Sequence, residues 1–203
     1  MAKAAIATAL FVPAMVGLAV QLATARTWSD GLLILALLLL APEQAYMAGA
    51  DLRQIDGVNR HRQDPRLKPF HRLVWVTILG QLVGFYLAGI GQPAWGILII
   101  LSSLIGFNLR AAIRLVPGAH QPILPWGPQN RRDVLLLNGI AAGLGIFWLM
   151  NLARIWAATG ILLIAVAYVV SKLRAYYQAW RRSSSDLLPH APHTIQQHPK
   201  PRQ

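Results

Sequence analysis

Glu43 is the residue whose type and position most suggest chemistry inside a membrane. It is the only glutamate of the chain and the only acidic residue within a long apolar run. It lies twelve residues after Gly31, which places it ~18 Å along a helix and in the inner half of a ~30 Å hydrocarbon core. Because burying an ionisable side chain at this depth is costly, such a residue is a candidate for proton or ion binding.

Two further polar residues occupy the equivalent position in later apolar runs. Asn108 lies twelve residues after Gly96, and Lys172 lies twelve residues after Gly160. If the three runs are equivalent helices, we expect Glu43, Asn108 and Lys172 at one level, with Asn108 bridging a Glu43–Lys172 ion pair. Two alternatives stay open. The residues could form a structural polar cluster, or Glu43 could lie near the inner headgroups while Lys172 snorkels to the same interface.

Signatures of catalysis and of metal binding are absent from the sequence. The chain has no cysteine, which excludes disulfides, thiolate metal sites and cysteine nucleophiles. No Ser/His/Asp set, phosphate-binding glycine loop or His-Glu-x-x-His motif occurs. All histidines lie outside the apolar runs, so an intramembrane histidine ligand for haem or chlorophyll is not supported. We expect a non-enzymatic protein without a metal site, and the sequence assigns no cofactor.

Composition places the chain in the membrane class. Of its 203 residues, 55% are hydrophobic and only 13% are charged, whereas about 25% of a soluble domain is charged. Uncharged runs of ~20 residues predict membrane-spanning helices. We predict an all-α fold of six such helices, joined as three hairpins, at about residues 4–25, 31–50, 73–90, 94–109, 134–150 and 155–171.

The segments between and after these runs are polar. We predict a loop from Asp51 to Arg72, and a proline-rich connection from Arg110 to Asp133 that lies along the membrane interface. Residues 1–182 are expected to form one transmembrane domain without a soluble core. Residues 183–203, rich in Ser, Pro, His and Gln, are predicted to be a disordered cytoplasmic tail.

A recurring spacing suggests that one hairpin is repeated three times. A glycine precedes a tryptophan by eleven residues near the outer end of each predicted hairpin, at Gly17–Trp28, Gly84–Trp95 and Gly145–Trp156. A similar apolar phrase beginning with glycine follows each tryptophan. A threefold repeat explains this pattern. The alternative is that six spans with short outer turns converge on such patterns without common origin.

Glycine pairs distinguish the odd-numbered spans from the even-numbered ones. Gly80 and Gly84 are four residues apart, as are Gly139 and Gly143, and this spacing lets helices approach closely. We therefore expect the odd spans at the centre and the Leu/Ile-rich even spans nearer lipid. The polar residues Gln81, Ser102, Ser103 and Asn138 are expected to form hydrogen bonds between helices rather than to contact a substrate.

Basic residues divide unevenly between the two sides of the predicted bundle. Seventeen lie on the side that holds both termini, against Arg26 and Arg154 on the other. By the positive-inside rule, both termini are cytoplasmic. The Arg-rich, Lys-poor composition suggests a bacterial inner membrane, with a photosynthetic membrane as the alternative. The first span could also be a secretory signal cleaved after Ala23-Thr24-Ala25, but a retained helix fits the repeat better.

The net charge of +12 does not indicate nucleic-acid binding, because the basic residues lie in loops between apolar spans. These residues either dock anionic lipid headgroups or an acidic partner, or they only set the topology. The candidates are Arg53, Arg60, Arg62, Arg66, Lys68, Arg72, Arg181 and Arg182.

The function predicted first is a non-enzymatic accessory, scaffold or assembly subunit of a larger complex, embedded in the lipid bilayer beside other membrane protein subunits. Small size, short outer turns and the lack of catalytic motifs favour it. The alternative is a small transporter or channel that uses the level of Glu43, Asn108 and Lys172.

Overall fold

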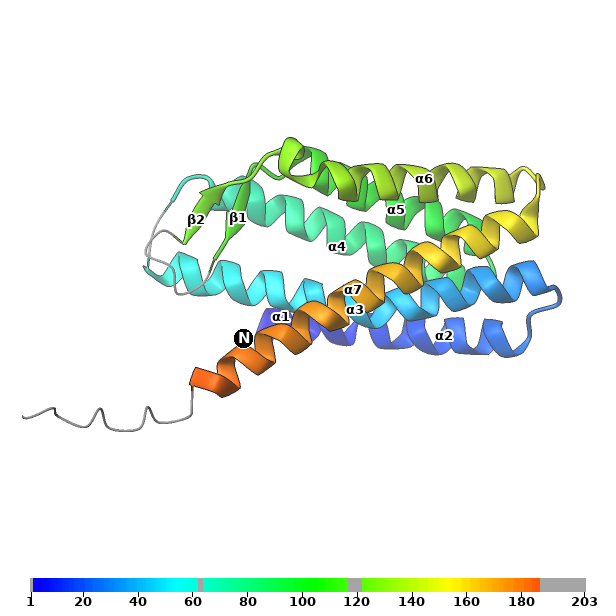
Figure 1. Cartoon of the computed structure of the whole chain (residues 1–203), viewed down its shortest axis with the longest axis horizontal. Coiled ribbons are helices and arrows are strands. Elements are labelled where there is room, and N and C mark those ends of the chain that lie inside the picture. The colour runs from blue at the N-terminus through cyan, green and yellow to red at the C-terminus, as the bar shows by residue number, and fades with distance from the viewer. Residues whose placement is uncertain (1, 62–63, 117–121, 187–203) are drawn as a thin grey trace, which may run out of the picture. The chain divides into compact units, whose positions relative to one another are not determined.

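The computed structural model of the chain describes residues 2–61, 64–116 and 122–186. It divides into two compact units, Met1–Val169 and Val170–Gln203, each considered by itself. The helices are α1 (Ala2–Ala9), α2 (Phe11–Ala23), α3 (Trp28–His61), α4 (Leu67–Gly89), α5 (Pro93–Arg110), α6 (Arg132–Leu149) and α7 (Arg154–Asp186). A short ribbon, β1 (Ile113–Leu115) and β2 (Ile123–Pro125), and the 3-10 helix η1 (Pro128–Arg131) lie between α5 and α6 (Figure 1).

Six helical segments are long and apolar enough to cross a membrane, which confirms the predicted number of such helices and fits a multi-pass membrane protein. The segments are Ala2–Ala23, Trp28–Asn59, Leu67–Gly89, Pro93–Arg110, Pro128–Leu149 and Arg154–Gln178. Each overlaps one predicted span. The pairing of these helices into three equivalent hairpins stays a prediction.

The first span is interrupted near its middle. Helix α1 ends at Ala9 and α2 begins at Phe11, with Leu10 between them. Pro13 lies in the first turn of α2 and has no backbone N–H, so the carbonyl of Ala9 loses its helical donor. The proline ring also crowds the preceding turn, and the helix breaks there.

The predicted loop from Asp51 to Arg72 is wrong for most of its length. Helix α3 continues to His61, and α4 already begins at Leu67. Leu52, Ile55 and Val58 recur every three residues and are all buried, as expected for one face of an amphipathic helix. The charged residues between them lie on the other faces, so charge alone was a poor indicator of a loop.

The connection between α5 and α6 contains secondary structure that the sequence analysis did not predict. Strands β1 and β2 pair antiparallel, with Leu115 opposite Ile123. Side chains alternate across the ribbon, so that Ile113 and Leu115 are buried while Arg114 is exposed. Strand β1 contacts α3, and the ribbon thereby adds apolar side chains to the core.

The predicted disordered tail is also wrong at its beginning. Residues Ser183 to Asp186 form the last turn of α7. The rest of that predicted tail, residues 187–203, lies outside the described residues.

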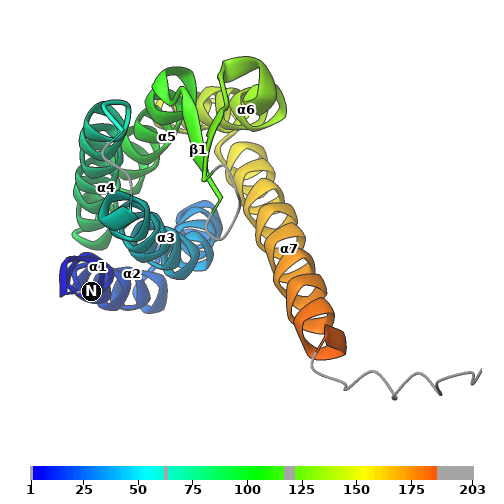
Figure 2. The same cartoon turned by 90° about the vertical axis from the view of Figure 1, so that its left-hand side faces the viewer.

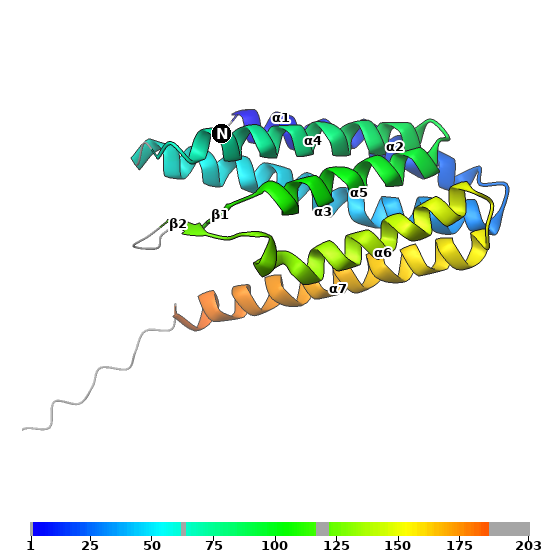
Figure 3. The same cartoon turned by 90° about the horizontal axis from the view of Figure 1, so that it is seen from above.

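Helix α3 is central to the unit formed by residues 1–169. It contacts α1, α2, α4 and α5, and the end-on view in Figure 2 shows it among these helices. Helices α4 and α5 run side by side (Figure 3). They approach closely at two glycines, where a Cβ on Gly84 would lie 2.7 Å from the carbonyl oxygen of Gly96.

Burial contradicts the expected division between odd and even spans. Within an 18-residue apolar window of each span, the share of buried residues is 22%, 44% and 17% in the first, third and fifth spans, and 44%, 33% and 22% in the second, fourth and sixth. Gly80 and Gly84 of α4 do face α5, where an added Cβ would meet Ser103 or Ile100. The same spacing in α6 does not mark a helix contact among the described residues: Gly139 is exposed, Gly143 is half-buried, and a Cβ added to either would meet no described atom within 4 Å.

Candidate functional site

A pair of buried glutamines joins α3 to α4 within the apolar bundle. Gln44 and Gln81 are 6% and 4% exposed, and Gln81 Nε2 donates a hydrogen bond of 2.7 Å to Gln44 Oε1. An amide in hydrocarbon is costly unless its polar atoms are paired, so each glutamine stabilises the burial of the other. Gln81 was expected to bond between helices, which this contact confirms. Gln44 was not singled out.

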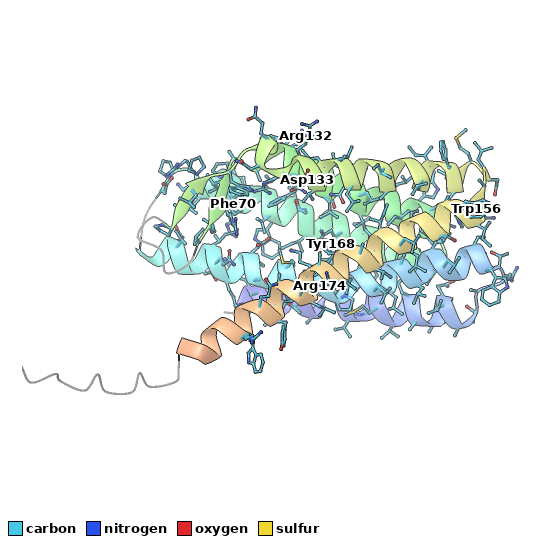
Figure 4. All side chains as sticks on the ribbon, in the orientation of Figure 1. Phe70, Arg132, Asp133, Trp156, Tyr168 and Arg174 are labelled. Carbon is cyan, nitrogen blue, oxygen red and sulfur yellow. The ribbon has the colours of Figure 1, made fainter. Side chains whose placement is uncertain are left out.

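Tyr168 and Glu43 extend this pair into a larger polar cluster. The hydroxyl of Tyr168, labelled in Figure 4 on α7, is hydrogen-bonded to the side chain of Gln44. Glu43 is half-buried and lies close enough to Tyr168 to interact with it electrostatically. Three helices thus supply two amides, a phenol and a neighbouring carboxyl. This set of groups can hold a proton or order hydrogen-bonded groups inside the membrane.

The three residues of the predicted polar level, Glu43, Asn108 and Lys172, lie in different surroundings. Asn108 of α5 is buried, where its amide donates to the carbonyl of Leu104 at 2.8 Å and accepts from Arg131 at 3.3 Å. Lys172 belongs to the separate unit that begins at Val170. A joint site of Glu43, Asn108 and Lys172 therefore stays a prediction. The hydrogen bonds described above are made by Gln44, the residue next to Glu43 in the chain, to Gln81 and Tyr168.

Arg131 forms hydrogen bonds that join the α5–α6 connection to the end of α5. Its Nη1 donates to Asn108 Oδ1 at 3.3 Å, and its Nη2 donates to the carbonyl of Ile113 at 3.2 Å. The guanidinium also lies 5.1 Å from the ring centre of Phe107, within cation–π range. Asp51 of α3 is close enough to add a favourable charge. Sequence reasoning counted Arg131 only toward topology.

A second arginine links two turns at the opposite end of the bundle. Arg154 Nη2 lies 2.9 Å from Asp30 Oδ1, and its guanidinium lies 4.0 Å from the ring centre of Trp148. The ion pair joins the start of α3 to the start of α7. One sequence signal could have found it, because Asp30 is the only acidic residue among the predicted outer turns.

The predicted docking residues lie at the surface wherever their side chains are described. Arg53, Lys68, Arg72 and Arg181 are exposed. Arg66 is exposed too but is occupied by Asp64, with Nη2 and Oδ2 2.7 Å apart. This hydrogen bond and the charge of Asp64 raise the pKa of Arg66 above its ordinary value. The side chains of Arg60, Arg62 and Arg182 lie outside the described residues. Docking by any of these residues stays a prediction.

Within the described ranges, no three His, Asp or Glu side chains lie close enough together to hold a metal ion.

Comparison with known proteins gives no match: the chain matches no family model, no curated protein and no solved structure.

Proposed function

We propose that the protein is a non-enzymatic accessory, scaffold or assembly subunit of a larger membrane complex, and that α6 contacts a neighbouring subunit. Support comes from the outward glycine face of α6. In the described part of the chain, a Cβ added at Gly139 or Gly143 would meet no atom within 4 Å. The residues of α6 that are buried, Ala141, Gly145 and Trp148, lie on the other side of the helix by the 3.6-residue period.

A glycine face directed outward requires a physical reason. Each glycine in a helix interior costs about 1 kcal/mol relative to alanine, and lipid tails gain nothing from a groove. Another helix does gain, because small residues let two backbones approach closely enough for van der Waals contact. Large apolar side chains border the two glycines and are exposed: Leu136, Ile140, Ile146, Phe147 and Met150. This arrangement suits a helix from another membrane subunit.

Topology and location are proposed on the distribution of charge. Seventeen basic residues on the side of both termini against two on the other favour cytoplasmic termini. A bacterial inner membrane, or a photosynthetic membrane, is the proposed location. The basic inner side would dock neighbouring subunits or anionic headgroups, and the threefold hairpin repeat is retained as a proposal about the origin of the fold.

The test is affinity purification of the full chain from native membranes in mild detergent, followed by mass spectrometry. The wild type should elute with other membrane proteins, and the double variant Gly139→Leu/Gly143→Leu should lose them. Gly106→Leu is the matched control, because a Cβ at Gly106 of α5 also meets nothing within 4 Å in the described residues. A lone monodisperse wild-type species would overturn the proposal, as would equal loss with Gly106→Leu.

The cluster around Gln44 favours a second candidate, a small transporter or channel. Here Glu43 would carry a proton or bind an ion beside Gln44, Gln81 and Tyr168, and Asn108 and Lys172 would complete the polar level. Proteoliposomes with a pH-sensitive or ion-sensitive dye inside would show flux that Glu43→Gln abolishes. Absence of flux in the wild type, or undiminished flux in Glu43→Gln, would remove this candidate.

A further inference from the structure

The C-terminal part of α7, residues 170–186, carries an aromatic face on one side. Tyr176, Tyr177 and Trp180 lie three, four and seven residues after Leu173, which places all four on a single helix face. Their exposed fractions are 60%, 38%, 60% and 66%. The rings of Tyr177 and Trp180 lie 6.1 Å apart. Residues 173–180 of α7 therefore present an exposed apolar, aromatic surface.

Positive charge lies beside this face. Arg174 and Arg181 are seven residues apart, so they share one side of the helix next to the aromatic residues, and both are exposed. With Lys172 and Arg182, residues 170–182 contain four basic residues and no acidic residue. The next acidic residue in the sequence is Asp186, at the end of α7, so positive charge predominates over residues 170–182.

The length of α7 determines where this surface lies. The helix has 33 residues, which corresponds to a length of about 50 Å. A hydrocarbon core is only ~30 Å thick, and the uncharged run that follows Arg154 ends at Ser171, directly before Lys172. The last third of α7 must therefore pass through the headgroup layer, which is the depth that Tyr and Trp side chains favour.

We propose that the face of α7 formed by Leu173, Tyr176, Tyr177 and Trp180, with Arg174 and Arg181 beside it, binds the headgroups of anionic phospholipids. The aromatic rings lie at the boundary between hydrocarbon and headgroups, and the guanidinium groups pair with lipid phosphates. A cluster of four or more basic residues directly after a membrane span is the pattern expected for such lipids. The proposal is independent of the subunit role of α6.

The experiment uses native mass spectrometry of the full-length protein in mild detergent, titrated with phosphatidylglycerol or phosphatidylcholine. The wild type should retain phosphatidylglycerol preferentially. Because each basic residue near an anionic surface contributes roughly 5-fold, Arg174→Gln/Arg181→Gln should lower that preference by roughly 30-fold. At 1 M salt, where the screening length is about 3 Å, the wild-type preference should collapse to that of the variant. Tyr177→Ala/Trp180→Ala should weaken retention of both lipids.

The control removes two other exposed arginines, Arg110→Gln/Arg132→Gln, and leaves the charge of α7 intact. It should change the lipid preference by less than one fifth of the effect in Arg174→Gln/Arg181→Gln. Equal loss in both double variants would overturn the proposal, because it would show an effect of net charge alone. Unchanged lipid preference in Arg174→Gln/Arg181→Gln, accompanied by loss of a co-purifying protein, would also overturn it and would assign the face to a protein partner.

Discussion

The Gln44–Gln81 hydrogen bond predicts that two substitutions together cost less than the sum of each alone. Gln81→Leu keeps the side-chain volume but leaves Gln44 Oε1 without its donor at a position that is 6% exposed. An unpaired buried polar atom costs about 1–3 kcal/mol, so the variant should lose about that much stability. Gln44→Leu should cost more, because it also deprives the Tyr168 hydroxyl of its partner.

In Gln44→Leu/Gln81→Leu both amides are gone, and two apolar side chains meet at the interface of α3 and α4. Hydrogen bonds between membrane helices contribute about 0.6 kcal/mol on average and up to about 1.7 kcal/mol. The cost of the double variant should fall short of the sum by an amount in that range. Adding Tyr168→Phe should recover part of the remaining loss, because it removes the hydroxyl whose hydrogen bond to Gln44 is lost in this variant.

The assay is reversible unfolding in mixed micelles by titration with dodecyl sulfate, followed by circular dichroism. Gln92→Leu is the matched control, since Gln92 is exposed in the turn before α5, and it should change stability by less than about 0.5 kcal/mol. Strict additivity of Gln44→Leu and Gln81→Leu would refute the reasoning, because it would mean that the two amides do not interact in the membrane.

The same titration checks four further predictions. Ala153 has a φ of 45°, a left-handed conformation that costs a side-chain-bearing residue about 1 kcal/mol, so Ala153→Gly should stabilise the protein by up to that amount. Asp30→Asn and Arg154→Gln should show a coupling of about 1 kcal/mol, as their 2.9 Å ion pair is only partly exposed; zero coupling would contradict this. Gly84→Ala should destabilise by about 1–3 kcal/mol because its Cβ would lie 2.6 Å from Ile100. Gly106→Ala, with nothing within 4 Å in the described residues, should stabilise by about 0.8–1 kcal/mol.

The number of spans could be predicted because each is an apolar run long enough to cross a bilayer, and this property needs no knowledge of neighbouring helices. The length of α3 could have been predicted as well, since Leu52, Ile55 and Val58 already have helical spacing. The charged residues between them are typical of a loop, but here they lie on the other faces of the helix. The ribbon of β1 and β2 was harder to predict, because each strand has only three residues.

The polar contacts depend on how the helices are rotated against each other, which the sequence does not state. Glu43 and Gln44 are adjacent in the chain. Gln44 is the partner of Gln81 because of the way in which α3 is rotated about its axis toward α4. The glycine pairs show the same limit. Gly80 and Gly84 face α5, whereas Gly139 and Gly143 face outward with identical spacing.

The ion pair of Asp30 and Arg154 has a consequence for the order in which the protein is made. The first partner is synthesised 124 residues before the second, so Asp30 enters the membrane surface long before Arg154 leaves the ribosome. The contact can form only when the last helix has been inserted. That helix carries Arg154, whose guanidinium also stacks on Trp148. A chain that stalls before this point keeps an unmatched carboxylate at the start of α3. Completion of translation is thereby linked to closure of the bundle.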